Sequence, residues 1–268
     1  FLYVTILLQK NEGDRMNIYE AIFARKSVRN YRMEALAPQV LTDIYKFYES
    51  IRGLFSGIPT EISIIENVEG LRHMGIFGRK APYYLAIYSA EAEKSMMNAG
   101  FIMGQMGLYL CMRGLGSCFA GMGNPPRSYR FKNGKKLVIL MAFGKAKGTC
   151  TRNPQEAKRL DLQALCVIKD TPGQWVQKLL EAARMAPSSY NSQPWRFLVY
   201  GSRIHVFAKK EKRGILGKYR EFDFGIMFSY IVLAAEEFWV DVDLIRLGNL
   251  SQKVFVNSQY ILSVIYNK

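Results

Sequence analysis

The feature of this sequence that most limits its fold is an internal repeat. Residues 39–65 recur 135 residues later, so that Gln39 corresponds to Gln174 and Pro59 to Pro194. Further along, the stretch that starts at Asn98 recurs 125 residues later, and a terminal apolar strand appears at 137–143 and again at 260–266. Because both halves carry helix, strand, central helix and strand in the same order, the sequence predicts two α+β lobes related by a pseudo-twofold axis.

The most distinctive polar segment is the run from Ala186 to Trp195, Ala-Pro-Ser-Ser-Tyr-Asn-Ser-Gln-Pro-Trp. Apolar residues recur at helical spacing before it, and Pro187 ends that helix because it removes a backbone donor and restricts the preceding residue. A Ser, Asn and Gln turn between a helix and a strand can direct amides and backbone N–H groups at a flat, heteroatom-rich ligand. An ordinary turn held by Asx and Ser hydrogen bonds explains the same residues equally well.

A second segment, Arg25-Lys26-Ser27-Val28-Arg29, places three cations and a hydroxyl within five residues. This composition suits a phosphate group, since Arg offers a bidentate fork, Lys a point charge and Ser one short hydrogen bond. The chain has 37 Lys and Arg residues, however, and most basic clusters in such a chain are solvated surface. The segment alone therefore does not identify a binding site.

Taken together, the segments resemble the nitroreductase family of FMN-dependent oxidoreductases. The resemblance rests on the Arg-x-Ser-x-Arg segment, on the Ala-Pro-Ser-Ser-x-Asn-x-Gln-Pro-Trp loop and on the glycine turn Gly114-Leu115-Gly116-Ser117, and it covers nearly everything after Met16. It implies that the chain binds FMN and that FMN carries the chemistry, without a catalytic protein residue. The cofactor-binding residues that it implies are Arg25, Lys26, Ser27, Arg29, Lys80, Gly121, Met122, Lys158, Arg159, Pro187, Ser188, Ser189, Asn191 and Gln193.

The resemblance also implies a role for each group of residues. The basic residues at 25–29 and 158–159 would bind the phosphate, although a solvated charge run explains Lys158 and Arg159 nearly as well. Backbone N–H groups at 120–122 would lie beside N5 and O4 of the flavin, with Ser189 and Asn191 at the polar edge of the ring. Lys80 is a candidate for contact with the ribityl chain or the pyrimidine.

Enzymes of the resembling family are homodimers that share two flavin sites across their interface, and here both subunits would be fused in one chain. The first repeat carries 52–56 where the Pro-Ser loop would stand, and the second carries Val240-Asp241-Val242 in place of the glycine turn. A carboxylate is unfavourable beside a phosphate. The resemblance therefore implies one FMN per chain and a monomer that suffices for binding.

The expected fold is accordingly a nitroreductase-like α+β fold, with two repeated lobes that form an intramolecular pseudo-dimer. Each lobe would have a mainly antiparallel sheet packed by helices. We expect an N-terminal extension at 1–15, a first repeat with its connecting segment at 16–167 and a second repeat at 168–268. The apolar run at 1–8 is too short to span a bilayer and lacks the basic n-region and cleavage site of a signal peptide.

Composition narrows the remaining classes of function. The four cysteines have no CxxC spacing and there are only two histidines, so we predict no metal site and a reducing, cytoplasmic location. A net charge of +15 raises nucleic-acid binding as an alternative, but the basic residues are spread throughout and no nucleic-acid-binding motif is present. We expect neither a nucleic-acid nor a membrane partner.

The resemblance implies hydride transfer from NAD(P)H through FMN to a nitroaromatic, a quinone or a similar electron-poor acceptor. Donor and acceptor would occupy the same face of the ring in turn. A protein that stores or senses FMN with little turnover is the alternative.

Overall fold

The computed structural model describes residues 16–69, 80–121, 125–209, 217–248, 250, 255 and 257–267. The expected extension at 1–15 and the predicted cofactor residue Met122 lie outside these residues.

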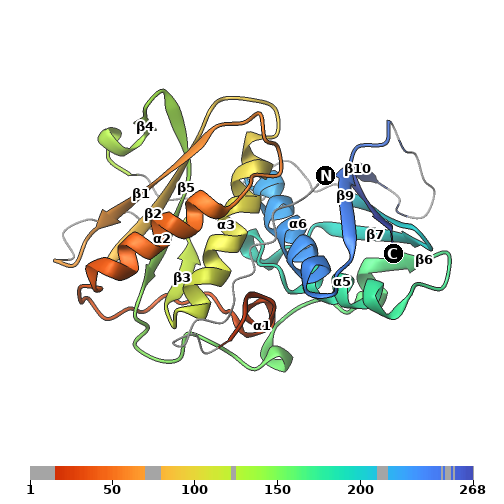
Figure 1. The fold of residues 1–268 in the computed structure, drawn as a ribbon, viewed down its shortest axis with the longest axis horizontal. Coiled ribbons are helices and arrows are strands. Elements are labelled where there is room, and N and C mark those ends of the chain that lie inside the picture. Colours follow the sequence, from red (N-terminus) through yellow and green to blue (C-terminus); the bar gives the residue numbers. More distant parts are fainter. Residues whose placement is uncertain are drawn as a thin grey trace.

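The first half of the chain forms one sheet packed by helices, on the left in Figure 1. The strands neighbour one another in the order β1-β2-β5-β3, all antiparallel, and β4 pairs with β5. The elements in chain order are α1 (Ile18–Ala24), α2 (Pro38–Ser50), β1 (Thr60–Glu66), β2 (Tyr83–Ser89), α3 (Ser95–Met112), β3 (Gly116–Phe119), the 3-10 turn η2 (Arg127–Tyr129), β4 (Phe131–Lys132) and β5 (Lys135–Gly144).

The second half forms another sheet, on the right in Figure 1, with the order β6-β7-β8-β10-β9. Its pairs are antiparallel except β6 with β7, which is parallel. The elements are η3 (Pro154–Glu156), α4 (Leu162–Leu165), β6 (Cys166–Ile168), α5 (Gln174–Met185), η4 (Ser189–Asn191), β7 (Trp195–Tyr200), β8 (Arg203–Lys209), α6 (Arg220–Glu237), β9 (Asp241–Ile245) and β10 (Ser258–Asn267).

The two sheets repeat one topology, which confirms the predicted α+β fold of two similar lobes. Strands β1, β2, β5 and β3 correspond in order to β7, β8, β10 and β9, while helices α2 and α3 correspond to α5 and α6. The predicted terminal apolar strands are β5 and β10. The expected boundary between residues 167 and 168 falls inside β6, which pairs with β7 of the second sheet.

Helices α3 and α6 lie side by side between the sheets (Figure 1) and are buried on nearly every side. A helix that is apolar all round is stable only inside a protein. The two backbones approach through a reciprocal pair of glycines. A Cβ on Gly100 would collide with the carbonyl oxygen of Phe222, and a Cβ on Gly225 would collide with that of Met97.

The outer side of β1 and that of its counterpart β7 are covered in different ways. In the second sheet, β6 occupies the edge beside β7. In the first sheet, side chains cap the edge of β1: Ile64 donates its N–H to the Tyr45 hydroxyl at 3.0 Å, and Lys132 Nζ donates to the Ile62 carbonyl at 3.1 Å. Capping of this kind hinders edge-to-edge association of strands.

Among the helices of the described residues, none combines the length and the apolar character needed to cross a membrane.

The helix contact predicts that Gly100→Ala and Gly225→Ala each destabilise the protein severely. The added methyl meets backbone rather than a movable side chain, so the free energy of unfolding should fall by about 3 kcal/mol or more. Urea denaturation measures this change. Gly148→Ala is the matched control, because a Cβ there has no neighbour within 4 Å, and a similar loss in the control would contradict the explanation.

His205 predicts a dependence of stability on pH. It is buried in β8, where its Nδ1 lies 2.6 Å from Ser263 Oγ and its Nε2 accepts a hydrogen bond from Arg203 Nε. Burial, and then the charge of Arg203, lowers the pKa of His205 below its ordinary 6.5. The unfolded chain therefore binds this proton first, and stability should fall as the pH drops below about 6.5.

Urea midpoints at pH 7.5 and 5.5 test this expectation, with His205→Asn as the comparison. The variant should lose much less stability between the two pH values than the natural protein does. Equal losses would show that another group is responsible.

Candidate active site

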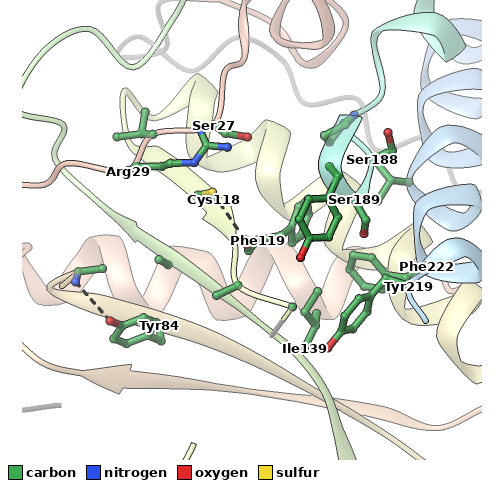
Figure 2. Close-up of a pocket in the computed structure, with 18 of the residues that line it drawn as sticks. Ser27, Arg29, Tyr84, Cys118, Phe119, Ile139, Ser188, Ser189, Tyr219 and Phe222 are labelled. Carbon is green, nitrogen blue, oxygen red and sulfur yellow. Dashed lines mark hydrogen bonds between the residues drawn. The ribbon is translucent and has the colours of Figure 1, made fainter. Parts of the chain in front are cut away.

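A cavity of about 340 Å³ lies between the two lobes, and both lobes line it (Figure 2). This volume is typical of cofactor and small-molecule sites. The first lobe contributes the segment after α1, the start of β2 and the turn after β3, and the second contributes the loop after α5 and the first turns of α6. Seven of the predicted cofactor residues line the cavity: Ser27, Arg29, Lys80, Gly121, Pro187, Ser188 and Ser189.

The loop after α5 is held by its own polar groups and by α6. Tyr190, Asn191 and Gln193 all have positive φ angles, and Ser188 Oγ accepts the Gln193 N–H at 2.9 Å. Asp223 of α6 accepts the Ser189 N–H at 2.9 Å and the Ser189 hydroxyl at 3.3 Å. The loop is thus both a self-bonded turn and a wall of the cavity.

Asn191 and Gln193 do not line the cavity. They bind residues 158–160, in the segment of the chain that connects the first lobe to the second. Asn191 Oδ1 accepts from Arg159 Nη1 at 2.7 Å, and its Nδ2 donates to the Lys158 carbonyl at 2.8 Å. Gln193 Oε1 accepts the Leu160 N–H at 2.7 Å. The Asn191 amide therefore binds residues 158–159 instead of pointing at the cavity, where a contact with the polar edge of a flavin was expected.

Three arginines gather beside the cavity. Arg25 is only 4% exposed, and the backbone places Arg152 next to it, because Arg25 bridges to Thr151 and Arg152 N donates to the Ala24 carbonyl. Burial, and then Arg152, lowers the pKa of Arg159 to about 10. Burial, and then Arg25, likewise lowers the pKa of Arg152. Arg159 is thus partly buried within a cationic cluster and is not part of a solvated charge run.

Several polar atoms of this region are buried without a partner. Among the described residues, Arg25 Nη2, Arg152 Nε and Ser117 Oγ have no hydrogen-bond partner, and none of the three arginines forms a salt bridge. Buried charged donors are normally paired. Their arrangement suits an anion with several acceptor oxygens.

The aromatic ring of Phe119 connects Arg25 with the cavity. The Arg25 guanidinium carbon is 5.8 Å from the centre of this ring, and Phe119 itself lines the cavity, edge-on to Phe222 at 5.3 Å. Figure 2 shows Phe119 between Ser27 on one side and Ser189 and Phe222 on the other. A ligand with both a flat ring and an anionic group matches such a site.

The remaining predicted cations are more exposed. Lys26 Nζ donates to Thr149 Oγ1 at 2.7 Å, and Lys158 lies at the surface. Sequence reasoning missed Arg152 and Asp223, because each acts through a contact with a distant segment. Cys118 is half-buried and lines the cavity.

The residues at the start of α3, which correspond by the repeat to those at the start of α6, have different partners. Asn98, the counterpart of Asp223, accepts the Phe55 N–H at 2.9 Å, so the loop at 53–58 is held as its counterpart is. Lys94, the counterpart of Tyr219, instead pairs with Glu221 at 3.3 Å. An ion pair with a residue of the second lobe therefore stands at the position that corresponds to Tyr219 of the cavity wall.

Solved structures resemble this fold. A protein from Thermotoga maritima, described as a putative nitroreductase, superimposes with a TM-score of 0.65 at 20% sequence identity, covering 93% of this chain and 94% of that chain. A nitroreductase family protein from Clostridium difficile (TM-score 0.46, 15% identity) covers 56% of this chain and 96% of its own. A nitroreductase with bound FMN from Desulfitobacterium hafniense (TM-score 0.43, 14% identity) covers 55% and 100%.

Among curated proteins, none matches this sequence. Residues 17–235, which include both the Arg25 segment and the Pro187 loop, match the family described as putative TM nitroreductase. This match spans most of the chain, and it agrees with the fold and with the cavity between the lobes. The chain belongs to this nitroreductase family.

Proposed function

We propose that the protein is an FMN-dependent oxidoreductase that transfers hydride from NAD(P)H to an electron-poor acceptor such as a nitroaromatic or a quinone. The observation that carries this proposal is the cavity between the lobes, with unpaired buried arginine nitrogens beside it. When bound, FMN supplies the hydride chemistry, and the protein supplies binding and orientation.

The arginine cluster fits the phosphate of FMN. Arg25, Arg152 and Arg159 offer guanidinium donors in a partly dehydrated place, where a charge-assisted hydrogen bond is about twice as strong as a neutral one. Ser117 Oγ adds a neutral donor in the same region. A phosphate dianion would satisfy these atoms and would offset the repulsion among the three cations.

The cavity fits the ring and its side chain. Its walls combine the apolar faces of Phe119 and Phe222 with the hydroxyls of Ser27, Ser188 and Ser189. Flat ligands are bound in this way, with apolar contact on the faces and a few placed polar groups at the edges. Lys80 and Arg29 stand at the same cavity and would bind the ribityl chain or a nicotinamide phosphate.

One chain would bind one FMN. The cation cluster and the turn at Gly121 come mainly from the first lobe, whereas the loop at 187–190 comes from the second, so both halves of one chain complete the site. At the position that corresponds to Tyr219, the Lys94–Glu221 pair joins the two lobes. We therefore propose a protein that needs no second subunit for its cofactor, and we place it in the cytoplasm.

Arg152→Gln and Arg25→Gln should each weaken FMN binding by about 10- to 100-fold, because each lost charge-assisted contact is worth about 1.5–3 kcal/mol. Quenching of flavin fluorescence measures the Kd and a stoichiometry near one per chain. Arg32→Gln is the control, since it makes the same change of charge at an exposed residue.

Thermal unfolding without FMN separates binding from structure. Removing an unpaired buried cation should leave the cofactor-free protein as stable as before or more stable. A large loss of stability with unchanged FMN affinity would show that the arginines are structural.

NADH or NADPH should bleach the absorbance of the bound FMN under anaerobic conditions, and a nitroaromatic or a quinone should restore it. Reduction by dithionite but by neither nicotinamide would favour storage or sensing of FMN over catalysis. Rates measured separately with the two nicotinamides would also define the donor.

A further inference from the structure

Tyr219 occupies a distinctive position in the wall of the cavity. It stands immediately before α6, is 7% exposed and lines the cavity together with Phe222, one turn further along the helix (Figure 2). Its ring lies directly over Gly121. A Cβ built on Gly121 would come within 3.0 Å of Tyr219 Cε2 and within 3.1 Å of its Cζ. The phenol end of the side chain is therefore next to the turn that follows β3.

The hydroxyl of Tyr219 differs from those of the other tyrosines that are built into the cavity wall. Tyr31 donates to the Val28 carbonyl at 2.6 Å, and Tyr84 accepts the Ala81 N–H at 3.3 Å, so both have structural partners. Within the described residues, the Tyr219 hydroxyl has no such partner, and it is not among the fully buried polar atoms that lack one, so a ligand in the cavity can reach it. An accessible phenol hydroxyl without an internal partner can donate a hydrogen bond to a bound ligand.

The surroundings of this hydroxyl favour a flat ring as its partner. Phe222 and Phe119 form an edge-to-face pair beside it, and the Lys218 ammonium lies 5.2 Å from the centre of the Tyr219 ring. The absence of a Cβ on Gly121 lets the Tyr219 ring pack closely against the turn after β3. A planar aromatic ligand can pack against these aromatic side chains and present an oxygen to the phenol.

The internal repeat supports a role in ligand binding. Lys94 is the counterpart of Tyr219, just as Asn98 is the counterpart of Asp223, and it forms an ion pair with Glu221. The tyrosine therefore occurs only in the copy of this position that faces the cavity. If it served helix packing alone, an apolar residue without a hydroxyl would suffice.

We infer that Tyr219 is a ligand-binding residue, whose hydroxyl donates a hydrogen bond to an oxygen of a planar aromatic ligand bound in the cavity. The inference rests on the proposed function in its choice of ligand. An oxygen of this kind is carried by the flavin ring and also by a nitroaromatic or quinone acceptor. Both ligands would accept the same hydrogen bond, and the experiment below distinguishes the flavin from the acceptor.

The test compares Tyr219→Phe with the natural protein in two titrations. The first measures the Kd of FMN by fluorescence quenching, and the second measures the Kd of nitrobenzene on the oxidised, FMN-loaded protein by perturbation of the flavin spectrum. Loss of one neutral hydrogen bond should weaken binding by about 3- to 10-fold. A change in the first titration assigns the oxygen to the flavin, and a change confined to the second assigns it to the acceptor.

Tyr45→Phe is the matched control, because it removes a phenol that caps β1 at Ile64. If Tyr219→Phe, like the control, leaves both dissociation constants within twofold of the natural protein, the inference is wrong. If the natural protein binds no FMN, the proposed function fails instead. Nitrobenzene is then titrated into the cofactor-free protein, followed by tryptophan fluorescence, and the same comparison of variants decides the inference.

Discussion

The rest of the structure depends on the close crossing of α3 and α6. Gly100 and Gly225 correspond in the two repeats. Gly100 packs against the backbone of Phe222, one turn before Gly225, and Gly225 packs against the backbone of Met97, one turn before Gly100. This reciprocity is what a two-fold axis between two similar helices produces. The contact between the two helices also positions the site, because it brings the start of α6 next to the turn at Gly121 of the first lobe. A larger residue at either glycine would separate the two halves of the cavity.

A symmetric frame carries an asymmetric site because side chains, and not elements, differ between the lobes. Both loops that precede β1 and β7 are anchored to a central helix by a polar residue, Asn98 in one lobe and Asp223 in the other. The cavity lies where Tyr219 and the Pro187 loop face the turn at Gly121. Where Lys94 stands instead, an ion pair with Glu221 occupies the interface. Duplication thus supplied the architecture, and a few substitutions between the copies determined where a ligand can bind.

The sequence predicted the parts of the structure that depend on local pattern. The helices α2 and α5, the central helices and the terminal strands follow from periodicity and from the repeat. The sequence did not predict contacts between distant segments. Arg152 reaches Arg25 only because a backbone bond joins it to Ala24, and nothing near Arg152 indicates this. Asn191 was expected at the ligand, but the connecting segment at 158–159 supplies partners for its amide that no local pattern reveals.

The arginine cluster connects the stability of the fold with its function. Burying a cation without a counterion is costly, and three arginines around one place also repel one another. Packing of the two central helices must offset this energy in the cofactor-free protein. An anion that binds the cluster removes the penalty in the folded state alone, so its binding energy adds to the stability of the fold. The cluster takes Arg25 from the first lobe and Arg159 from the connecting segment, and Asn191 of the second lobe binds Arg159. An anion bound to the cluster would therefore also connect the two lobes. The site is therefore strained without its ligand, which gives the fold a physical reason to bind an anionic cofactor tightly.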